Sequence, residues 1–230
     1  MEVVKFDRVR HAYSLNGEAL PSVTQVLPEI PAEMLLSQRF IDKTNIGTRV
    51  HFACEVLDND VIGWKPLKTK KFVLSTADLD YVCKKIRNKP DFPYKDLVPE
   101  DLPYINAWVK FRNEMNPEIF RVEERVFSEK YGFAGTVDRV LAIKSLMFIA
   151  DIKTSTEVSP GAALQTAGYV LAFKERNPKF AEVGRSIVHL LPTGAYSWKP
   201  YPKATFMHDV NVFLSKVVSF KWDQENIKRR

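Results

Sequence analysis

Two aspartates in short apolar runs constrain the fold of this chain more than any other feature of its sequence. Val137–Ile143 and Leu146–Ile152 are rich in branched residues and are separated by only two residues. This pattern predicts a β-hairpin with a two-residue turn. In such a hairpin the residue numbers of every opposed pair add up to the same value. Asp138 is therefore expected directly opposite Asp151.

Two opposed carboxylates need a positive charge between them. Directly opposed residues have Cβ atoms about 5 Å apart, and residues two apart share a face, so Lys153 joins both aspartates. Carboxylates this close raise each other's pKa unless a cation lies between them, and oxygen ligands of this kind suit Mg²⁺ or Mn²⁺. The alternative is an ordinary polar surface hairpin. Apolar residues on both faces of the second strand favour a buried one.

Composition limits the classes of protein to consider. The 45% of hydrophobic residues and 27% of charged residues predict a globular chain, and 230 residues suffice for one sizeable core. A net charge of +6 favours a polyanionic partner. Cys54 and Cys83 stand in no metal-ligand spacing, which predicts a reduced compartment without zinc or an iron–sulfur cluster. No signal peptide or membrane-spanning run is recognisable, so we expect a soluble, cytoplasmic protein with no membrane partner.

Hydrophobic periodicity predicts an α/β (α+β) fold with a mixed central β-sheet flanked by helices. One domain, 1–230, is expected to contain three regions: an N-terminal hairpin region at 1–30, a helical insertion at 60–117 and a sheet core at 118–200. Helices are predicted at 32–43, from 44–47 to 58, from 75 to before 90, 99–115, 161–175 and 203–220. Strands are predicted at 120–127, through the hairpin, and at 183–191 and 196–201.

Four short motifs occur in order along the chain: GTRVHFACE at 47–55, GTVD at 135–138, DIK at 151–153 and QTAGY at 165–169. Together they resemble the PD-(D/E)xK nuclease superfamily, in particular its RecB-like exonuclease branch with the QxxxY helix. SVTQVL at 22–27 and VEERVF at 122–127 are similar to segments of phage-encoded members and of mitochondrial genome maintenance exonucleases. The resemblance spans roughly residues 20–175.

The resemblance implies a restriction-endonuclease-like core that hydrolyses phosphodiester bonds. By the same resemblance, Asp138 and Asp151 would ligate Mg²⁺ together with the backbone carbonyl of Ile152. Lys153 would hold or help to deprotonate the attacking water and stabilise the charge that develops on the phosphorus centre. A role for Lys153 as a plain partner of Asp151 is the alternative.

Further site residues follow from the same resemblance. His51 would be an additional metal ligand or a phosphate contact, and Glu123 would serve a second metal position. Gln165 and Tyr169 would line the active site, where they contact DNA phosphate or position the lysine; simple core packing is the alternative for Tyr169. Glu55, one turn after His51, either orients it or is a solvated helix residue.

This sequence departs from parts of the superfamily. Some relatives carry a four-cysteine iron–sulfur cluster, which two cysteines cannot build. The first motif is GTVD in place of a literal PD, and it keeps the carboxylate.

The expected function is that of a Mg²⁺-dependent DNA exonuclease, acting on single-stranded or end-bearing DNA in replication, recombination or repair, in a host cytoplasm if phage-encoded. One alternative is a double-strand 5′ to 3′ exonuclease or an endonuclease of the same superfamily. Another is a catalytically silent DNA-binding module, against which the intact Asp138, Asp151 and Lys153 argue. Three aromatic residues are candidates for base stacking: Trp64, Trp108 and Tyr131.

Overall fold

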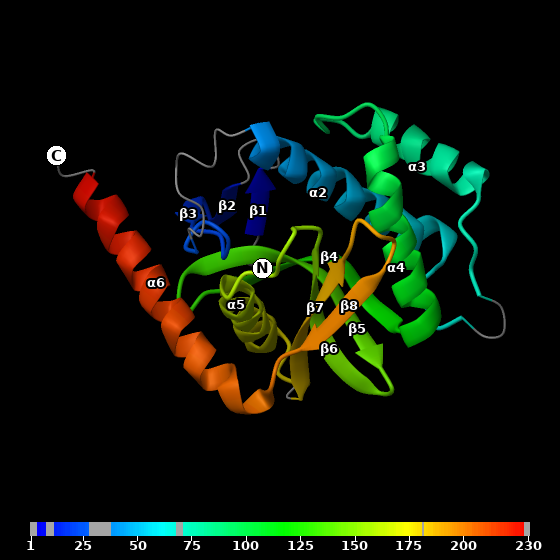
Figure 1. Ribbon diagram of the computed structural model, residues 1–230. Helices are drawn as coiled ribbons and strands as arrows, with labels where there is room; N and C mark the ends of the chain where they lie inside the picture. The colour runs from blue at the N-terminus through cyan, green and yellow to red at the C-terminus, as the bar shows by residue number, and fades with distance from the viewer. Residues whose placement is uncertain (1–3, 8–11, 28–37, 68–70, 181, 228–230) are drawn as a thin grey trace.

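The computed structural model describes residues 4–7, 12–27, 38–67, 71–180 and 182–227. Its described part holds a five-stranded mixed sheet flanked by helices and a small three-stranded antiparallel sheet (Figure 1). The predicted mixed sheet with flanking helices is therefore confirmed. No helix in these residues combines the length and apolarity that crossing a membrane requires.

The small sheet is formed by β1 (Val4–Asp7), β2 (Ala12–Leu15) and β3 (Glu18–Leu20), in that order. Asn16 and Gly17, both with positive φ, form the turn that joins β2 to β3 inside the predicted hairpin region. The hydroxyl of Tyr13 on β2 lies 2.7 Å from Oγ1 of Thr136 on the central sheet. This contact ties the small sheet to the GTVD segment.

One long helix, α2 (Gln38–Val56), stands where two were predicted. The predicted break near residues 44–47 is wrong, and residues 32–37 of the first predicted helix lie outside the described residues. At Gly47, which lies inside this helix, a Cβ would come within 3.2 Å of Oγ1 of Thr154. The glycine therefore permits close approach of the strand-to-helix loop. A π-helical turn, η1 (Leu57–Val61), follows α2 directly.

Two further helices cover the same side. α3 (Thr76–Asn88) is capped by Ser75, whose side chain and that of Asp78 form a capping box. The 3₁₀ turn η2 (Pro99–Asp101) leads into α4 (Leu102–Met115), which buries Trp108 and Phe111 completely. Arg49 of α2 donates two hydrogen bonds to buried Asp101, so α2 is fixed to the start of α4.

The central sheet has the order β4-β5-β6-β7-β8. Its strands are β4 (Glu118–Ser128), β5 (Phe133–Ile143), β6 (Leu146–Lys153), β7 (Val183–Leu190) and β8 (Tyr196–Pro200). β6 and β7 are parallel and are joined through α5 (Gly161–Arg176), whereas the other neighbours are antiparallel. The two-residue turn between β5 and β6 is confirmed, with positive φ at both Lys144 and Ser145.

Apolar side chains pack on both faces of this sheet. On β6, Ala150 and Ile152 pack with α2, α3 and α4, and Ile149 packs with α5 and α6 (Phe206–Ile227) on the opposite face. Figure 1 shows α5 and α6 on the side away from α3 and α4. Asp151 and Lys153 alternate with Ile152, so they project from the face that α5 covers.

α5 and α6 approach each other closely because α5 carries small residues. A Cβ at Gly168 would come within 2.8 Å of the Phe213 ring of α6. α6, preceded by the short 3₁₀ turn η3 (Lys203–Thr205), extends seven residues beyond the predicted end at residue 220. Val210, Phe213 and Val217 are buried, as the pattern indicates.

Candidate functional site

A cavity of about 1050 Å³ opens where α2, the small sheet and the central hairpin meet. Every site residue that the sequence suggests lines it: His51, Glu123, Asp138, Asp151, Ile152, Lys153, Gln165 and Tyr169. These residues come from α2, three neighbouring strands and α5. The fold thus brings together side chains that are up to 118 positions apart in the sequence.

Three carboxylates form a row across β4, β5 and β6. Val122 and Glu124 pair with Arg139 and Val137, so Glu123 and Asp138 lie between two paired positions of β4 and β5. The β5–β6 pairs run from Ile143 opposite Leu146 to Arg139 opposite Ala150, as the turn length predicts. Continuing this register by one residue would bring Asp138 opposite Asp151, and that pair stays a prediction. Glu123 has φ of +51°, an uncommon value for a residue with a side chain.

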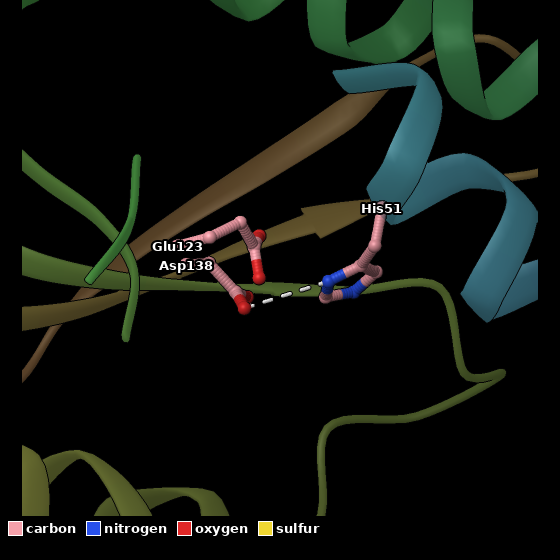
Figure 2. A group of neighbouring side chains, drawn as sticks. All are labelled: His51, Glu123 and Asp138. Carbon is pink, nitrogen blue, oxygen red and sulfur yellow. Dashed lines mark ion pairs between the residues drawn. The ribbon is translucent and has the colours of Figure 1, made fainter. Parts of the chain in front are cut away.

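The closest group of potential metal ligands comprises His51, Glu123 and Asp138 (Figure 2). One ligand atom from each lies within 4.8 Å of the other two, and Nδ1 of His51 is 3.5 Å from Oδ1 of Asp138. Ligands at about 2.1 Å from Mg²⁺ are at most about 4.2 Å apart, so small side-chain movements would suffice to bind an ion. The donor set of two carboxylates and one imidazole fits Mn²⁺ and, through its oxygens, Mg²⁺.

Asp151 belongs to a second cluster next to this group. Its Oδ1 accepts a hydrogen bond of 2.9 Å from Nε2 of Gln165, and its Oδ2 lies 2.9 Å from Nζ of Lys153. Lys153 donates in turn to Oε1 of Gln165 over 2.8 Å. The three side chains form a closed ring in which Gln165 fixes both the acid and the lysine. That Asp151 and Asp138 hold one ion together stays a prediction.

The two clusters are joined through the main chain. The backbone N–H of Ile152 donates a 2.6 Å hydrogen bond to Oδ2 of Asp138. This bond fixes one oxygen of Asp138 toward β6, while the other faces His51. The structure therefore shows a main-chain contact at Ile152; the predicted role of its carbonyl as a metal ligand stays a prediction.

Tyr169 lies against the GTVD segment. A Cβ at Gly135 would come within 2.6 Å of its ring, so the glycine of this motif makes room for the tyrosine. The ring is buried, and its hydroxyl accepts a hydrogen bond of 3.1 Å from Nε2 of Gln165. Tyr169 thus packs in the core and also borders the cavity, which combines the two interpretations that the sequence left open.

Crowded charges displace the pKa values of the cluster. Burial opposes the charged imidazole of His51, but the Asp138 carboxylate outweighs it and raises the pKa to about 9. Burial, and then the charge of Asp138, raise the pKa of Glu123 to about 7. Burial acts against ionised Asp138 as well, yet the facing His51 brings its pKa below the usual range. At neutral pH a protonated His51 therefore supplies the positive charge that the carboxylates require.

Binding of a divalent cation to this group is expected to strengthen as the pH rises. His51 must lose its proton to become a ligand, so the apparent affinity should rise about tenfold per pH unit between 7 and 9. Below pH 7 the rise should be steeper, because Glu123 must then lose a proton too. Calorimetric titration with Mn²⁺ in buffers of different ionisation enthalpy measures the released protons. A pH-independent affinity would exclude His51 as a ligand.

Glu55 and the three aromatic residues suggested for base stacking are placed as follows in the structure. Glu55 forms an ion pair of 3.3 Å with Lys89 at the cavity. Trp108 is wrong as a base-stacking residue, because it is completely buried and its indole donates to Asp58. Trp64 and Tyr131 do not line the cavity. The aromatic residues that do are Phe6, Tyr13, Phe52, Phe92 and Tyr169.

The sequence patterns did not predict a buried ionic network that lies next to the site. Asp58 accepts hydrogen bonds from Trp108, Arg112 and Arg139, and all four residues are almost completely buried. Arg139 also lies 3.3 Å from Oε1 of Glu123. The sequence feature that could have indicated this network is Arg139, an arginine in an apolar strand directly after Asp138. Buried charges are almost always paired.

Comparison of the sequence with models of protein families and with curated proteins gave no match.

Proposed function

We propose that this chain is a metal-dependent deoxyribonuclease with a restriction-endonuclease-like core. In this proposal it is an exonuclease that hydrolyses phosphodiester bonds in single-stranded or end-bearing DNA during replication, recombination or repair. The observation that carries the proposal is the row of Glu123, Asp138 and Asp151 in one cavity, with Lys153 beside it. The order of the GTVD, DIK and QTAGY motifs supports the same chemistry.

The donor set suits a resident divalent cation. Asp138, Glu123 and His51 would hold it, with Asp151 as the further carboxylate of the row. Such an ion would polarise a phosphoryl oxygen and lower the pKa of a bound water. The raised pKa of His51 supports this assignment, because the neighbouring Asp138 carboxylate raises it against the effect of burial.

In this proposal Lys153 acts on the phosphate or on the attacking water. Its ammonium group is half-buried and is held by Oδ2 of Asp151 and Oε1 of Gln165. The hydrogen bond to Gln165 and the ion pair with Asp151 hold this compact charge at the cavity wall. A positioned ammonium stabilises negative charge that develops on a phosphoryl oxygen during attack. Gln165 positions both partners and does not itself need to titrate.

The test is a time course with end-labelled single-stranded and double-stranded DNA, with Mg²⁺, with Mn²⁺ and with chelator. The proposal expects mononucleotides or short products from single strands, in the presence of metal only. Faster degradation of duplex ends would favour a double-strand exonuclease. DNA binding that weakens with salt, with no cleavage product in either metal, would favour a silent DNA-binding module instead.

Covalently closed single-stranded circles distinguish the two modes of cleavage. An exonuclease needs a terminus, so circles should stay intact under conditions that degrade the matched linear strand completely. Opening of the circles by the wild-type protein but not by Asp151→Asn would show internal cleavage and make the enzyme an endonuclease. Gel analysis under denaturing conditions resolves circles from their linear product.

A further inference from the structure

Charge balance links the buried network to the candidate metal site. Arg112 and Arg139 are both almost completely buried, and the only fully buried carboxylate that the described residues place against them is Asp58. Two guanidinium groups and one carboxylate leave one positive charge uncompensated. Leaving a charge buried without a partner is strongly destabilising. A second anion is therefore needed at this place in the fold.

Glu123 is the anion that the structure supplies. Its Oε1 lies 3.3 Å from Nη1 of Arg139, and its side chain keeps 31% of its surface exposed to the cavity. Arg112 instead donates its other hydrogen bond to the carbonyl of Gly63. Of the two arginines that pair with Asp58, it is Arg139 that contacts Glu123 within the described part of the chain.

Arg139 also holds the neighbouring acid. The same Nη1 donates a 2.6 Å hydrogen bond to the carbonyl of Asp138, and Nε donates a 2.7 Å bond to Oδ2 of Asp58. Its guanidinium carbon lies 5.3 Å from the centre of the Trp108 ring. Nη2 is buried and has no hydrogen-bond partner among the described residues, so a donor remains for the second oxygen of Glu123. Asp58, the main chain of Asp138 and the Trp108 ring thus hold the Arg139 guanidinium in place.

We infer that Arg139 is a positioning residue for the metal ligands: anchored by Asp58, it aligns the Glu123 carboxylate and the Asp138 main chain before an ion binds. This inference rests on the metal site of the proposed function but not on cleavage of DNA. Glu123 needs such a hold because its φ of +51° is unfavourable for a residue with a side chain. Arg139 serves the role better than a lysine would, because its planar fork presents several donors in a fixed arrangement.

The experiment compares Arg139→Met with Arg112→Met by Mn²⁺ titration calorimetry at pH 8, with circular dichroism to verify folding. Both variants remove one buried guanidinium from Asp58, so both should unfold at lower temperature. Only Arg139→Met should weaken Mn²⁺ binding, by about 10- to 100-fold, the usual effect of losing a partner of a metal ligand. Arg112→Met should bind Mn²⁺ as the wild type does. Equal affinities for the two variants would overturn the inference.

Two further variants distinguish an effect on the alignment of the metal ligands from a general loss of protein stability. Arg139→Lys keeps the charge and loses the fork, so it should recover part of the affinity and unfold at a higher temperature than Arg139→Met. In a Glu123→Gln background, Arg139→Met should add little further loss, because both changes act on one interaction. Fully additive losses, or wild-type affinity in Arg139→Lys together with wild-type affinity in Arg139→Met, would contradict the assignment. Wild-type Mn²⁺ binding without DNA cleavage would refute only the proposed function.

Discussion

Asp151→Asn is expected to abolish metal-dependent DNA cleavage, with a loss on the order of 10³-fold or more. The substitution keeps the shape of the side chain but removes the charge that pairs with Lys153 and contributes to the row of carboxylates. Metal ions contribute several kcal/mol to transition-state stabilisation, and about 1.4 kcal/mol corresponds to tenfold in rate. The measurement is the initial rate on end-labelled single-stranded DNA at saturating Mg²⁺.

Glu157→Gln is the matched control for this loss. Glu157 is an exposed carboxylate that borders the same cavity on the loop after β6, outside both clusters. Its neutralisation should leave the rate nearly unchanged. If Asp151→Asn retained wild-type activity while folded, the assignment of the site would be wrong. If Glu157→Gln lost as much activity, a general effect of cavity charge would explain both results.

Asp58→Ala is expected to lower the free energy of unfolding by about 3–5 kcal/mol. The change leaves the guanidinium groups of Arg112 and Arg139 buried without their shared anion, and it removes the acceptor for the indole of Trp108. Breaking a buried ion pair on one side has a cost of about this size. Chemical denaturation followed by tryptophan fluorescence measures it, because Trp108 lies within the network.

Asp96→Ala provides the comparison for an ion pair at the surface. Asp96 pairs with Arg87 across 2.7 Å, and both side chains are about half exposed. Exposed pairs contribute little because water and salt screen them, so the denaturation midpoint should stay close to that of the wild type. Similar midpoints for Asp58→Ala and Asp96→Ala would mean that the network is hydrated, contrary to its complete burial here.

Local patterns made the hairpin and the site row predictable. The length of the turn between β5 and β6 determines their register, which holds up to the pair of Arg139 and Ala150. This register predicts, without any knowledge of the rest of the fold, that Asp138 lies opposite Asp151. Strand, helix and capping patterns likewise predicted the sheet core and the helix that carries Gln165. Two-residue alternation predicts that Lys153 shares a face with Asp151. His51, Glu123, Gln165 and Tyr169 were expected at the site from the family resemblance.

Long-range packing explains what the sequence did not reveal. A break between two helices was predicted near Gly47, yet Gly47 lies inside α2. Thr154, 107 positions later, leaves little room there for a side chain. The sequence suggested Trp108 as a base-stacking residue and indicated no role for Arg139. Both side chains are buried against Asp58. Such partners come from distant segments, and no local period or spacing encodes them.

The most direct test of the account is an anomalous diffraction measurement on crystals soaked in Mn²⁺. We expect one peak or two adjacent peaks in the cavity, with Asp138 as a ligand and with Glu123, His51 and Asp151 contributing the further protein donors. The Lys153 ammonium should lie next to the ion-bound site and still contact Gln165. Full Mn²⁺ occupancy elsewhere in the molecule, with this cavity empty, would contradict the central claim that the carboxylate row is a metal centre.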